Sequence, residues 1–256
     1  MTQLIGALCE GGQKVVLVSD RLVGREGLVF ERGSKGHKIT GNAMVLTAGT
    51  PHEPEFIDEA KNALEGVTSP RVLKIAETLA DKYREARDAR IDVDILGRHC
   101  FASAEEFYRS SSSLHDHVVF EVMEQIEEYQ LGVHALLGGV GRKAHLYLIN
   151  DPGRYSSFDQ VGFFCPGMGK EQAEATFVWY DFTPEFPLSD TLYVAFEAKR
   201  RAESAGSVGR TTDAWVIDDG GIHEIERECL EHLDQIYTSR HELQRVPPEA
   251  SDIDLP

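Results

Sequence analysis

The chain has 256 residues, of which 43 are acidic and 26 are lysine or arginine, so its formal net charge at pH 7 is −17. This negative charge disfavours nucleic acids and anionic membranes as partners, because both would repel it. Apolar residues make up 41% of the chain without any run long enough to span a membrane, and we expect one globular domain with a sizeable core.

The cysteines and histidines show no spacing typical of a metal site. The four cysteines are far apart in the sequence, at Cys9, Cys100, Cys165 and Cys229. They fit reduced core thiols better than a disulfide framework. His115 and His117 lie two residues apart and would not share a helix face. The N-terminus also lacks the basic and apolar regions of a signal peptide. We therefore expect a cytoplasmic protein without a metal or cofactor.

The first part of the chain predicts a β-hairpin that follows directly on a threonine. Apolar residues fill 4–9, a polar turn with two glycines occupies 10–13, and a β-rich run covers 15–18. Two such runs around a glycine-containing turn are typical of a hairpin. The second strand ends on a carboxylate beside an arginine, Asp20-Arg21.

Thr2 is a candidate nucleophile because it stands directly behind Met1. Removal of the methionine would leave a threonine with both a hydroxyl and a free α-amine. An α-amine has a pKa of about 8, so a useful fraction is neutral at physiological pH. It can then act as general base toward the hydroxyl of the same residue. Many proteins begin with Met-Thr, so this interpretation depends on the rest of the chain.

Strands and helices alternate in groups along the remaining sequence. Runs rich in branched and aromatic residues predict strands at 43–49, 133–137, 144–149, 161–165, 212–217 and 222–225. Apolar residues at helical spacing predict helices at 54–65, from 70 to about 83, 114–129, 170–181, 188–205 and 227–242. Ser103, followed by two glutamates, predicts a capped helix start. We expect loops or helix breaks at 89–100 and 110–113.

This order of elements around Thr2, Asp20 and Lys38 resembles the β-type subunits of the proteasome, which are N-terminal-nucleophile (Ntn) hydrolases. Gly167-Met168-Gly169, before a helix, and Thr212-Asp213, at the start of a late strand, are further points of resemblance. Together they extend the resemblance over most of the chain.

The resemblance implies an α+β fold of two antiparallel sheets packed face to face with helices outside, a four-layer αββα sandwich. It implies a single Ntn-hydrolase domain over 1–243. We expect the polar and acidic residues 244–256 to form a disordered tail.

The resemblance also implies a threonine-type peptidase whose nucleophile is the Thr2 hydroxyl. Lys38 would lie against this hydroxyl and Asp20 would orient the lysine, since a buried ammonium needs a carboxylate partner. Taken singly, Asp20 could be a turn residue at a strand end and Lys38 a solvated strand residue. Lys35 is the alternative to Lys38. We favour Lys38, because it directly precedes the isoleucine that enters the next strand.

The same resemblance assigns the rest of the site. The amide of Gly49 would stabilise the oxyanion, which needs backbone donors, and Ser207 would lie near the nucleophile. Substrate would bind as an added strand along Arg21 to Val23 and Thr47 to Gly49. A pocket near Met44 would favour apolar side chains.

Met168 departs from the family, which has a serine between these two glycines, and a thioether cannot relay a proton. Three functions stay open. The first is a peptidase for peptides or unfolded proteins inside a homo-oligomeric ring, whose possible ATPase partner is unknown. The second is a related amide hydrolase or transferase acting on a small molecule or a single protein, because fold does not fix function. The third is an inactive scaffold subunit, which Met168 favours.

Overall fold

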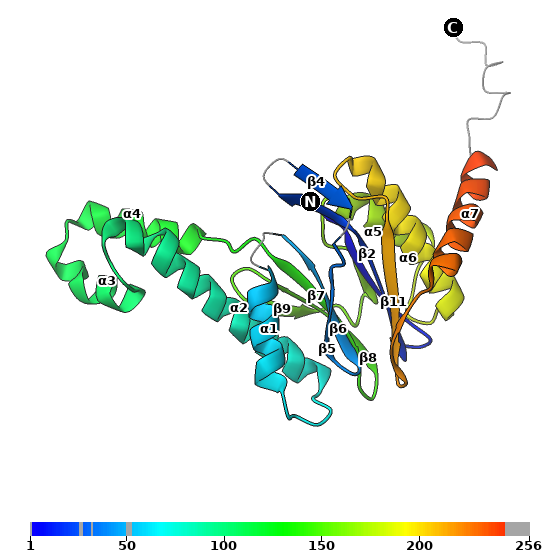
Figure 1. Ribbon diagram of the computed structural model, residues 1–256, viewed down its shortest axis with the longest axis horizontal. Helices are drawn as coiled ribbons and strands as arrows, with labels where there is room; N and C mark the ends of the chain where they lie inside the picture. The colour runs from blue at the N-terminus through cyan, green and yellow to red at the C-terminus, as the bar shows by residue number, and fades with distance from the viewer. Residues whose placement is uncertain (1, 26–27, 32, 50–52, 244–256) are drawn as a thin grey trace, which may run out of the picture.

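The computed structural model in Figure 1 describes residues 2–25, 28–31, 33–49 and 53–243. The predicted acidic tail, 244–256, lies outside these residues. The strands within them are β1 (Leu4–Cys9), β2 (Lys14–Asp20), β3 (Leu22–Arg25), β4 (Leu28–Glu31), β5 (Gly36–Thr40), β6 (Ala43–Ala48), β7 (His134–Val140), β8 (Ala144–Asn150), β9 (Arg154–Ser157), β10 (Phe163–Phe164), β11 (Thr212–Asp218) and β12 (Gly221–Glu224). The α-helices are α1 (Glu53–Leu64), α2 (Val72–Asp94), α3 (Ala104–Ser110), α4 (Asp116–Glu128), α5 (Lys170–Trp179), α6 (Leu188–Ala202) and α7 (Arg227–Leu243).

The described part of the protein is an α+β structure with two five-stranded antiparallel sheets and seven α-helices. The first sheet has the strand order β10-β1-β2-β11-β12, and the second has the order β5-β6-β7-β8-β9. A separate ribbon joins β3 and β4. The predicted hairpin of β1 and β2 is confirmed, with Leu4 opposite Ser19 and Cys9 opposite Lys14.

Continuous apolar sequence in β1 and β2 has a structural reason, since both faces of the first sheet are covered. One hydrophobic cluster contains residues of both sheets, including Leu17, Leu46 and Trp215. Gly6 is needed in this cluster, because a Cβ there would lie 2.5 Å from Leu146 Cδ1. The absence of a side chain at Gly6 therefore allows the two sheets to approach each other closely.

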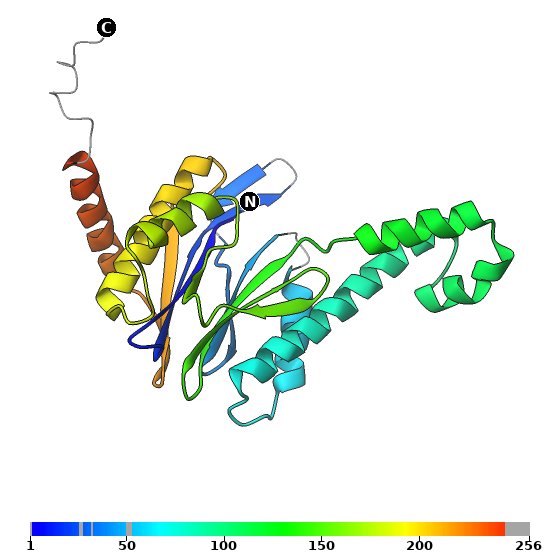
Figure 2. The ribbon, with the colours of Figure 1, turned by 180° about the vertical axis from the view of Figure 1, so that it is seen from behind.

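Each sheet also packs against its own pair of helices. Residues of β1, β2 and β11 share a second cluster with α5 and α6, around Phe177 and Phe196. Residues of β6, β7 and β8 share a third cluster with α1 and α2, around Phe56 and Tyr83. Figures 1 and 2 show these two helix pairs on either side of the sheets.

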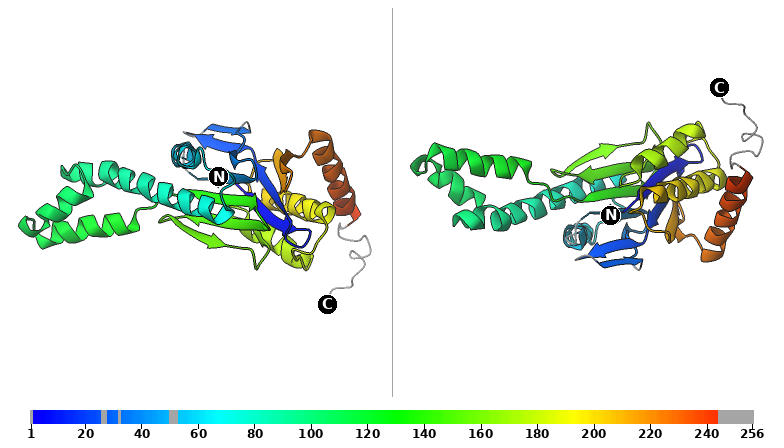
Figure 3. Two further views of the ribbon diagram at one scale, coloured as in Figure 1. Left: turned by 90° about the horizontal axis from the view of Figure 1, so that it is seen from below. Right: turned by 90° about the horizontal axis from the view of Figure 1, so that it is seen from above.

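The end of α2 extends away from the sheets and, with α3 and α4, forms an arm, which we define as residues 91–129. Figure 3 shows this arm protruding from the rest of the molecule in two views. The arm has its own hydrophobic cluster, in which Ile91, Leu96, Phe107 and Val122 are buried. Among the described residues, none of 91–129 belongs to the clusters that involve the sheets.

The arm includes most of the segment 89–100, for which a loop or a helix break was predicted, and a helix does end there, at Asp94. Helix α2 continues through this segment to Asp94, and a 3-10 turn covers Leu96–His99. The helical pattern is weak there because only a few apolar side chains face the small cluster of the arm, rather than a whole sheet. A second 3-10 turn, Ser111–Ser113, lies where a helix break was predicted.

Several smaller predictions can also be compared. The hydroxyl of Ser103 caps α3 by accepting a hydrogen bond from the amide of Glu106, as predicted. The edge strand β9 and the ribbon of β3 and β4 were not predicted. Cys9 and Cys165 are buried free thiols, whereas Cys100 and Cys229 are exposed, so only two of the four are core residues.

Every helix within the described residues is too short or too polar to cross a lipid bilayer.

Substitution of Phe107 by alanine should loosen the arm without unfolding the sheets. Removal of a buried phenylalanine side chain costs about 3–5 kcal/mol, and here the loss falls on a cluster that the sheets do not share. We expect faster amide hydrogen exchange over 96–128 and unchanged exchange in β1 and β7. Phe120→Ala is the matched control, because Phe120 is 73% exposed on the same arm. Equal acceleration in the sheets would show that the arm and the sheets unfold together.

Candidate functional site

A threonine, a lysine and a carboxylate meet in a buried cluster at the start of β1. Nζ of Lys35 donates a hydrogen bond to Oγ1 of Thr2. The same ammonium lies 2.8 Å from Oδ1 of Asp20. Thr2 is 7% exposed, Lys35 6% and Asp20 0%. The cluster therefore holds a hydroxyl in direct contact with a buried ion pair.

The carboxylate of Asp20 is satisfied by donors from four places in the chain. Oδ1 accepts the amide of Gln3 at 2.9 Å in addition to Lys35. Oδ2 accepts the amides of Leu22 at 3.1 Å and Gly209 at 2.8 Å. A buried carboxylate is tolerable only with such partners. Asp20 thus joins the end of β2 to the N-terminus and to the segment before β11.

The lysine that contacts Thr2 is Lys35 and not Lys38, which corrects the prediction. Lys38 is exposed in β5, opposite Met44 of β6. Lys35 lies just before β5, where its carbonyl accepts the amide of Thr47 at 3.0 Å. The next residue, Gly36, packs against Met44 and Trp215, and a Cβ there would require the Met44 side chain to move. The chain therefore packs closely at this point and buries Lys35.

The sequence does contain an indication of this arrangement that the prediction did not use. Lys35 belongs to the run Gly33-Ser34-Lys35-Gly36. Glycines mark positions where the backbone approaches its neighbours closely. A lysine between two glycines is therefore a better candidate for burial than a lysine in a strand whose side chains point alternately to the core and to solvent.

The backbone of the first residues is fixed by the segment 166–169. The carbonyl of Thr2 accepts the amide of Met168 at 3.1 Å. The buried side chain of Gln3 donates to the carbonyl of Cys165 at 3.0 Å and accepts the amide of Gly169 at 2.9 Å. Gly167 has a φ of +136° and contacts the Thr2 carbonyl so closely that a Cβ would overlap it. Met168 thus contacts Thr2 through its main chain.

Ser207 lies in the segment whose Gly209 amide binds Asp20, but no hydrogen bond joins it to Thr2. Its Oγ is buried and has no hydrogen-bond partner among the described residues. The segment is held by Lys199, a fully buried lysine that sequence reasoning missed. Its Nζ donates to Glu203 Oε1 and to the carbonyl of Arg210, each at 2.7 Å. Burial lowers the pKa of Lys199, and the nearby Glu203 opposes this shift.

The predicted substrate-binding residues fall in two different environments. Val23 is exposed in β3, and the Arg21 side chain is partly exposed with its guanidinium 2.5 Å from Asp213 Oδ1. Thr47 is buried, and its Oγ1 lies 3.2 Å from Nε2 of His37. Met44 is 2% exposed within the cluster shared by the two sheets. The structure therefore places Met44 in the core and not in a surface pocket.

Gly49 follows β6 with a φ of +147°, a conformation that favours glycine. It contacts the backbone of Gly132 and Val133, and a Cβ would overlap the Gly132 carbonyl. The Thr47 amide binds the Lys35 carbonyl at 3.0 Å, so Gly49 lies two residues along the chain from this contact. Gly49, the predicted oxyanion residue, is therefore close in sequence to Thr47, whose amide binds the carbonyl of Lys35.

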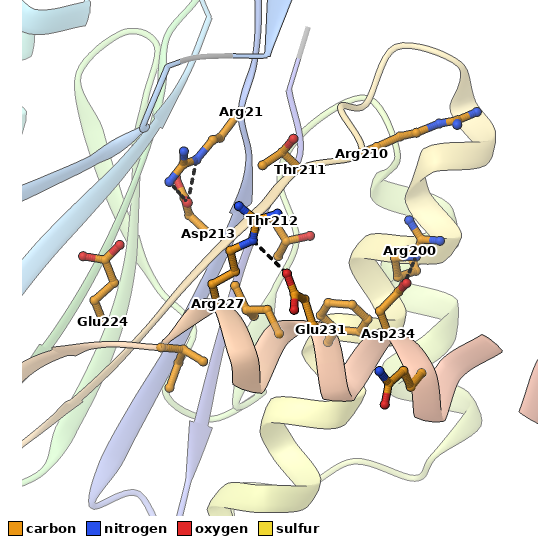
Figure 4. A pocket seen from close by; sticks show the side chains of 14 residues that line it. Arg21, Arg200, Arg210, Thr211, Thr212, Asp213, Glu224, Arg227, Glu231 and Asp234 are labelled. Carbon is orange, nitrogen blue, oxygen red and sulfur yellow. Dashed lines mark hydrogen bonds and ion pairs between the residues drawn. The ribbon is translucent and has the colours of Figure 1, made fainter. Parts of the chain in front are cut away.

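A cleft of about 690 Å³ lies elsewhere, between β11 and α7. Figure 4 shows that charged side chains line it in pairs: Arg21 with Asp213, Arg227 with Glu231, and Arg200 with Asp234. Neither Thr2 nor Lys35 belongs to its lining. Among the described residues, no group of three or more His, Cys, Asp or Glu side chains is arranged to hold a metal ion.

No family model matches the chain, and a search of curated proteins finds no significant match.

Replacement of Lys35 by methionine should destabilise the protein far more than replacement of Lys38. Removal of one partner of a buried ion pair leaves the other charge uncompensated, which costs about 3–5 kcal/mol. Lys38 is exposed, and surface substitutions usually change stability by no more than about 0.5 kcal/mol. Urea denaturation of Lys35→Met and Lys38→Met measures the difference. Equal stabilities of the two variants would contradict the burial of the Lys35–Asp20 pair.

Stability should fall as the pH is lowered through the ordinary pKa of histidine, about 6.5. Burial, helped by Lys61, lowers the pKa of His37 in the folded protein. Between the folded and unfolded pKa values the unfolded chain binds the proton more readily, so its population grows as the pH falls. The titration of His37 therefore changes the free energy of unfolding by at most about 1.4 kcal/mol per pH unit.

Urea denaturation at pH values from about 5 to about 8, on either side of the histidine pKa of about 6.5, tests this slope. His37→Gln should reduce it, whereas His117→Gln, at an exposed position of the arm, should not. An identical slope in wild type and His37→Gln would exclude His37 as the source.

Proposed function

We propose that the protein is a threonine-type peptidase of the Ntn-hydrolase class, with a four-layer αββα sandwich of the proteasome β-subunit type. The observation that carries this proposal is the contact of the Lys35 ammonium with both Thr2 Oγ1 and Asp20. A hydroxyl on the second residue of the chain, beside a buried lysine held by a carboxylate, has the parts of an N-terminal nucleophile.

The proposal requires that Thr2 become the first residue of the mature chain. Its α-amine then takes the proton of Oγ1 as the oxygen attacks the substrate carbonyl carbon. The Lys35 ammonium stabilises the developing negative charge on Oγ1, because it already donates to this atom. Asp20 holds the ammonium in place at 2.8 Å.

The tetrahedral intermediate carries its negative charge on the former carbonyl oxygen, which the amide of Gly49 stabilises. Its collapse breaks the C–N bond, and the leaving amine takes the proton from the α-ammonium of Thr2. The product is an ester between the substrate acyl group and Oγ1. Water, deprotonated by the same amine, attacks the ester carbon. The C–Oγ1 bond then breaks, the α-ammonium returns its proton to Oγ1, and a carboxylic acid is released. This sequence needs no metal or cofactor.

Met168 does not prevent this mechanism, because the α-amine itself serves as the base. The contribution of Met168 is its main-chain amide, which binds the carbonyl of Thr2 and fixes the nucleophile. Substrate would be a peptide or an unfolded protein, bound as a strand beside Gly49. In the proposed homo-oligomeric ring, a neighbouring subunit would cover exposed apolar side chains of α5, such as Val178 and Trp179.

A second candidate is a scaffold subunit without activity. The observation that favours it is that no serine side chain stands between Gly167 and Gly169, where the resembling family has one, and that Ser207 makes no hydrogen bond to Thr2. The amine-based mechanism does not need either serine, and we therefore place the peptidase first.

The intact mass before and after incubation with a peptide epoxyketone distinguishes the candidates. This reagent closes a ring through both the hydroxyl and the free amine of an N-terminal threonine. We expect a mass without Met1 and one adduct in the wild type, with no adduct in Thr2→Ala. Lys35→Ala should slow adduct formation by about 10²-fold or more, the usual loss when a group that stabilises developing charge is removed.

Lys38→Ala is the matched control for Lys35→Ala and should react at the wild-type rate, with circular dichroism confirming that both variants are folded. Retained Met1 without an adduct would support the scaffold subunit. Loss of Met1 without an adduct would instead favour an amide hydrolase or transferase with a different acyl pocket.

A further inference from the structure

Gly49 rests on a short segment, 131–133, that connects the arm to β7. In β6 and β7, Ala48 is paired with His134, so Gly49 lies directly beyond the last pair of this ladder. A Cβ on Gly49 would overlap the carbonyl oxygen of Gly132 and would lie 2.8 Å from Cα of Val133. The position of the Gly49 backbone therefore depends on where segment 131–133 lies.

The carboxylate of Asp151 fixes this segment with both of its oxygens. Oδ1 accepts the amide of Leu131 at 2.8 Å, and Oδ2 accepts the amide of Gly132 at 2.9 Å. Hydrogen bonds to a carboxylate are about twice as strong as those between neutral groups. Gly132 has a φ of +73°. With this bend in the backbone before β7, the amides of Leu131 and Gly132 can face the same carboxylate.

Tyr83 of α2 holds the same segment from the side of the helices. Its buried hydroxyl donates to the carbonyl of Val133 at 3.1 Å and lies 3.4 Å from the amide of the same residue. Burial, together with the nearby carboxylate of Asp151, raises the pKa of Tyr83 well above its usual range. Tyr83 and Asp151 thus act on three successive residues behind Gly49.

We propose that Asp151 is a positioning residue for catalysis, which holds the amide of Gly49 at the oxyanion through segment 131–133. This inference rests on the proposed function. Asp151 does not touch the substrate, and it acts on the reaction only through the backbone against which Gly49 packs. An oxyanion donor must lie within a few tenths of an ångström of its position, since a displacement of about 1 Å can cost about 10²-fold in rate.

Asp151→Asn removes one of the two acceptors and places an NH₂ group against a backbone amide. We expect the maximal rate of epoxyketone adduct formation to fall about 10- to 100-fold, because attack on the ketone also forms an oxyanion. The half-saturating concentration of the reagent should change less than about twofold, since Asp151 does not contact the bound peptide. Tyr83→Phe, which removes only a hydroxyl, should show a smaller loss in the same quantity.

Two controls separate positioning from general loosening. Periodate oxidation cleaves the 1,2-amino alcohol of an N-terminal threonine without any oxyanion, and its rate should be the same in Asp151→Asn and wild type. Asp159→Asn is the matched variant, because Asp159 also binds a backbone amide, that of Leu146 at 2.8 Å, in the same sheet but away from Gly49. It should leave the adduct rate unchanged.

The outcomes are distinct. A wild-type chain that forms no adduct overturns the proposed function and this assignment with it. A wild type that reacts, with Asp151→Asn and Tyr83→Phe reacting equally fast, overturns the assignment alone. The assignment also fails if Asp151→Asn changes the periodate rate and the half-saturating concentration in parallel with the adduct rate.

Discussion

The buried carboxylate of Asp20 is the constraint on which the candidate site depends. It is fully shielded from solvent and accepts four donors, from Gln3, Leu22, Lys35 and Gly209. Removing a charge from water costs several kcal/mol unless nearly all of its acceptor positions are used. The N-terminus, the end of β2, the start of β5 and the segment before β11 must therefore all be in place at once. An ion pair that orients a hydroxyl is thereby coupled to the formation of both sheets.

Close backbone packing is the second requirement of this region. Gly167 lies on the carbonyl of Thr2, Gly49 lies on Gly132, and a Cβ at Gly209 would be 3.0 Å from the Asp20 carboxylate. Each glycine lets its main chain approach a neighbour at a place where the side chain of another residue type would stand. Main-chain groups also adopt fewer positions than side chains do. The geometry around Thr2 is consequently set in large part by the backbone, and Lys35 and Asp20 contribute charged atoms to it.

The sequence predicted the elements whose side chains follow one clear period. The hairpin of β1 and β2, the late hairpin of β11 and β12, and helices such as α6 were found because long apolar runs or helical spacing mark them. The arm was missed in part because its helices bury few side chains. Lys38 was preferred to Lys35 because a choice between two lysines three residues apart depends on tertiary packing, which local patterns do not contain. The pairing of Asp151 with amides twenty residues earlier is likewise visible only after folding.

The separate core of the arm has a consequence for how the chain can vary in length. Residues 91–129 supply no side chain to the three clusters that hold the sheets and their helices. Residues of α2 bind the later part of this segment: Arg87 donates to the carbonyls of Ile126 and Tyr129, and Asp94 accepts a hydrogen bond from the Tyr129 hydroxyl. A segment that packs on its own core in this way can be lengthened or shortened at a small entropic cost, since the closure entropy of a loop grows slowly with its length. The exposed surface of the arm can accordingly change in sequence without altering a contact of the buried ion pair beside Thr2.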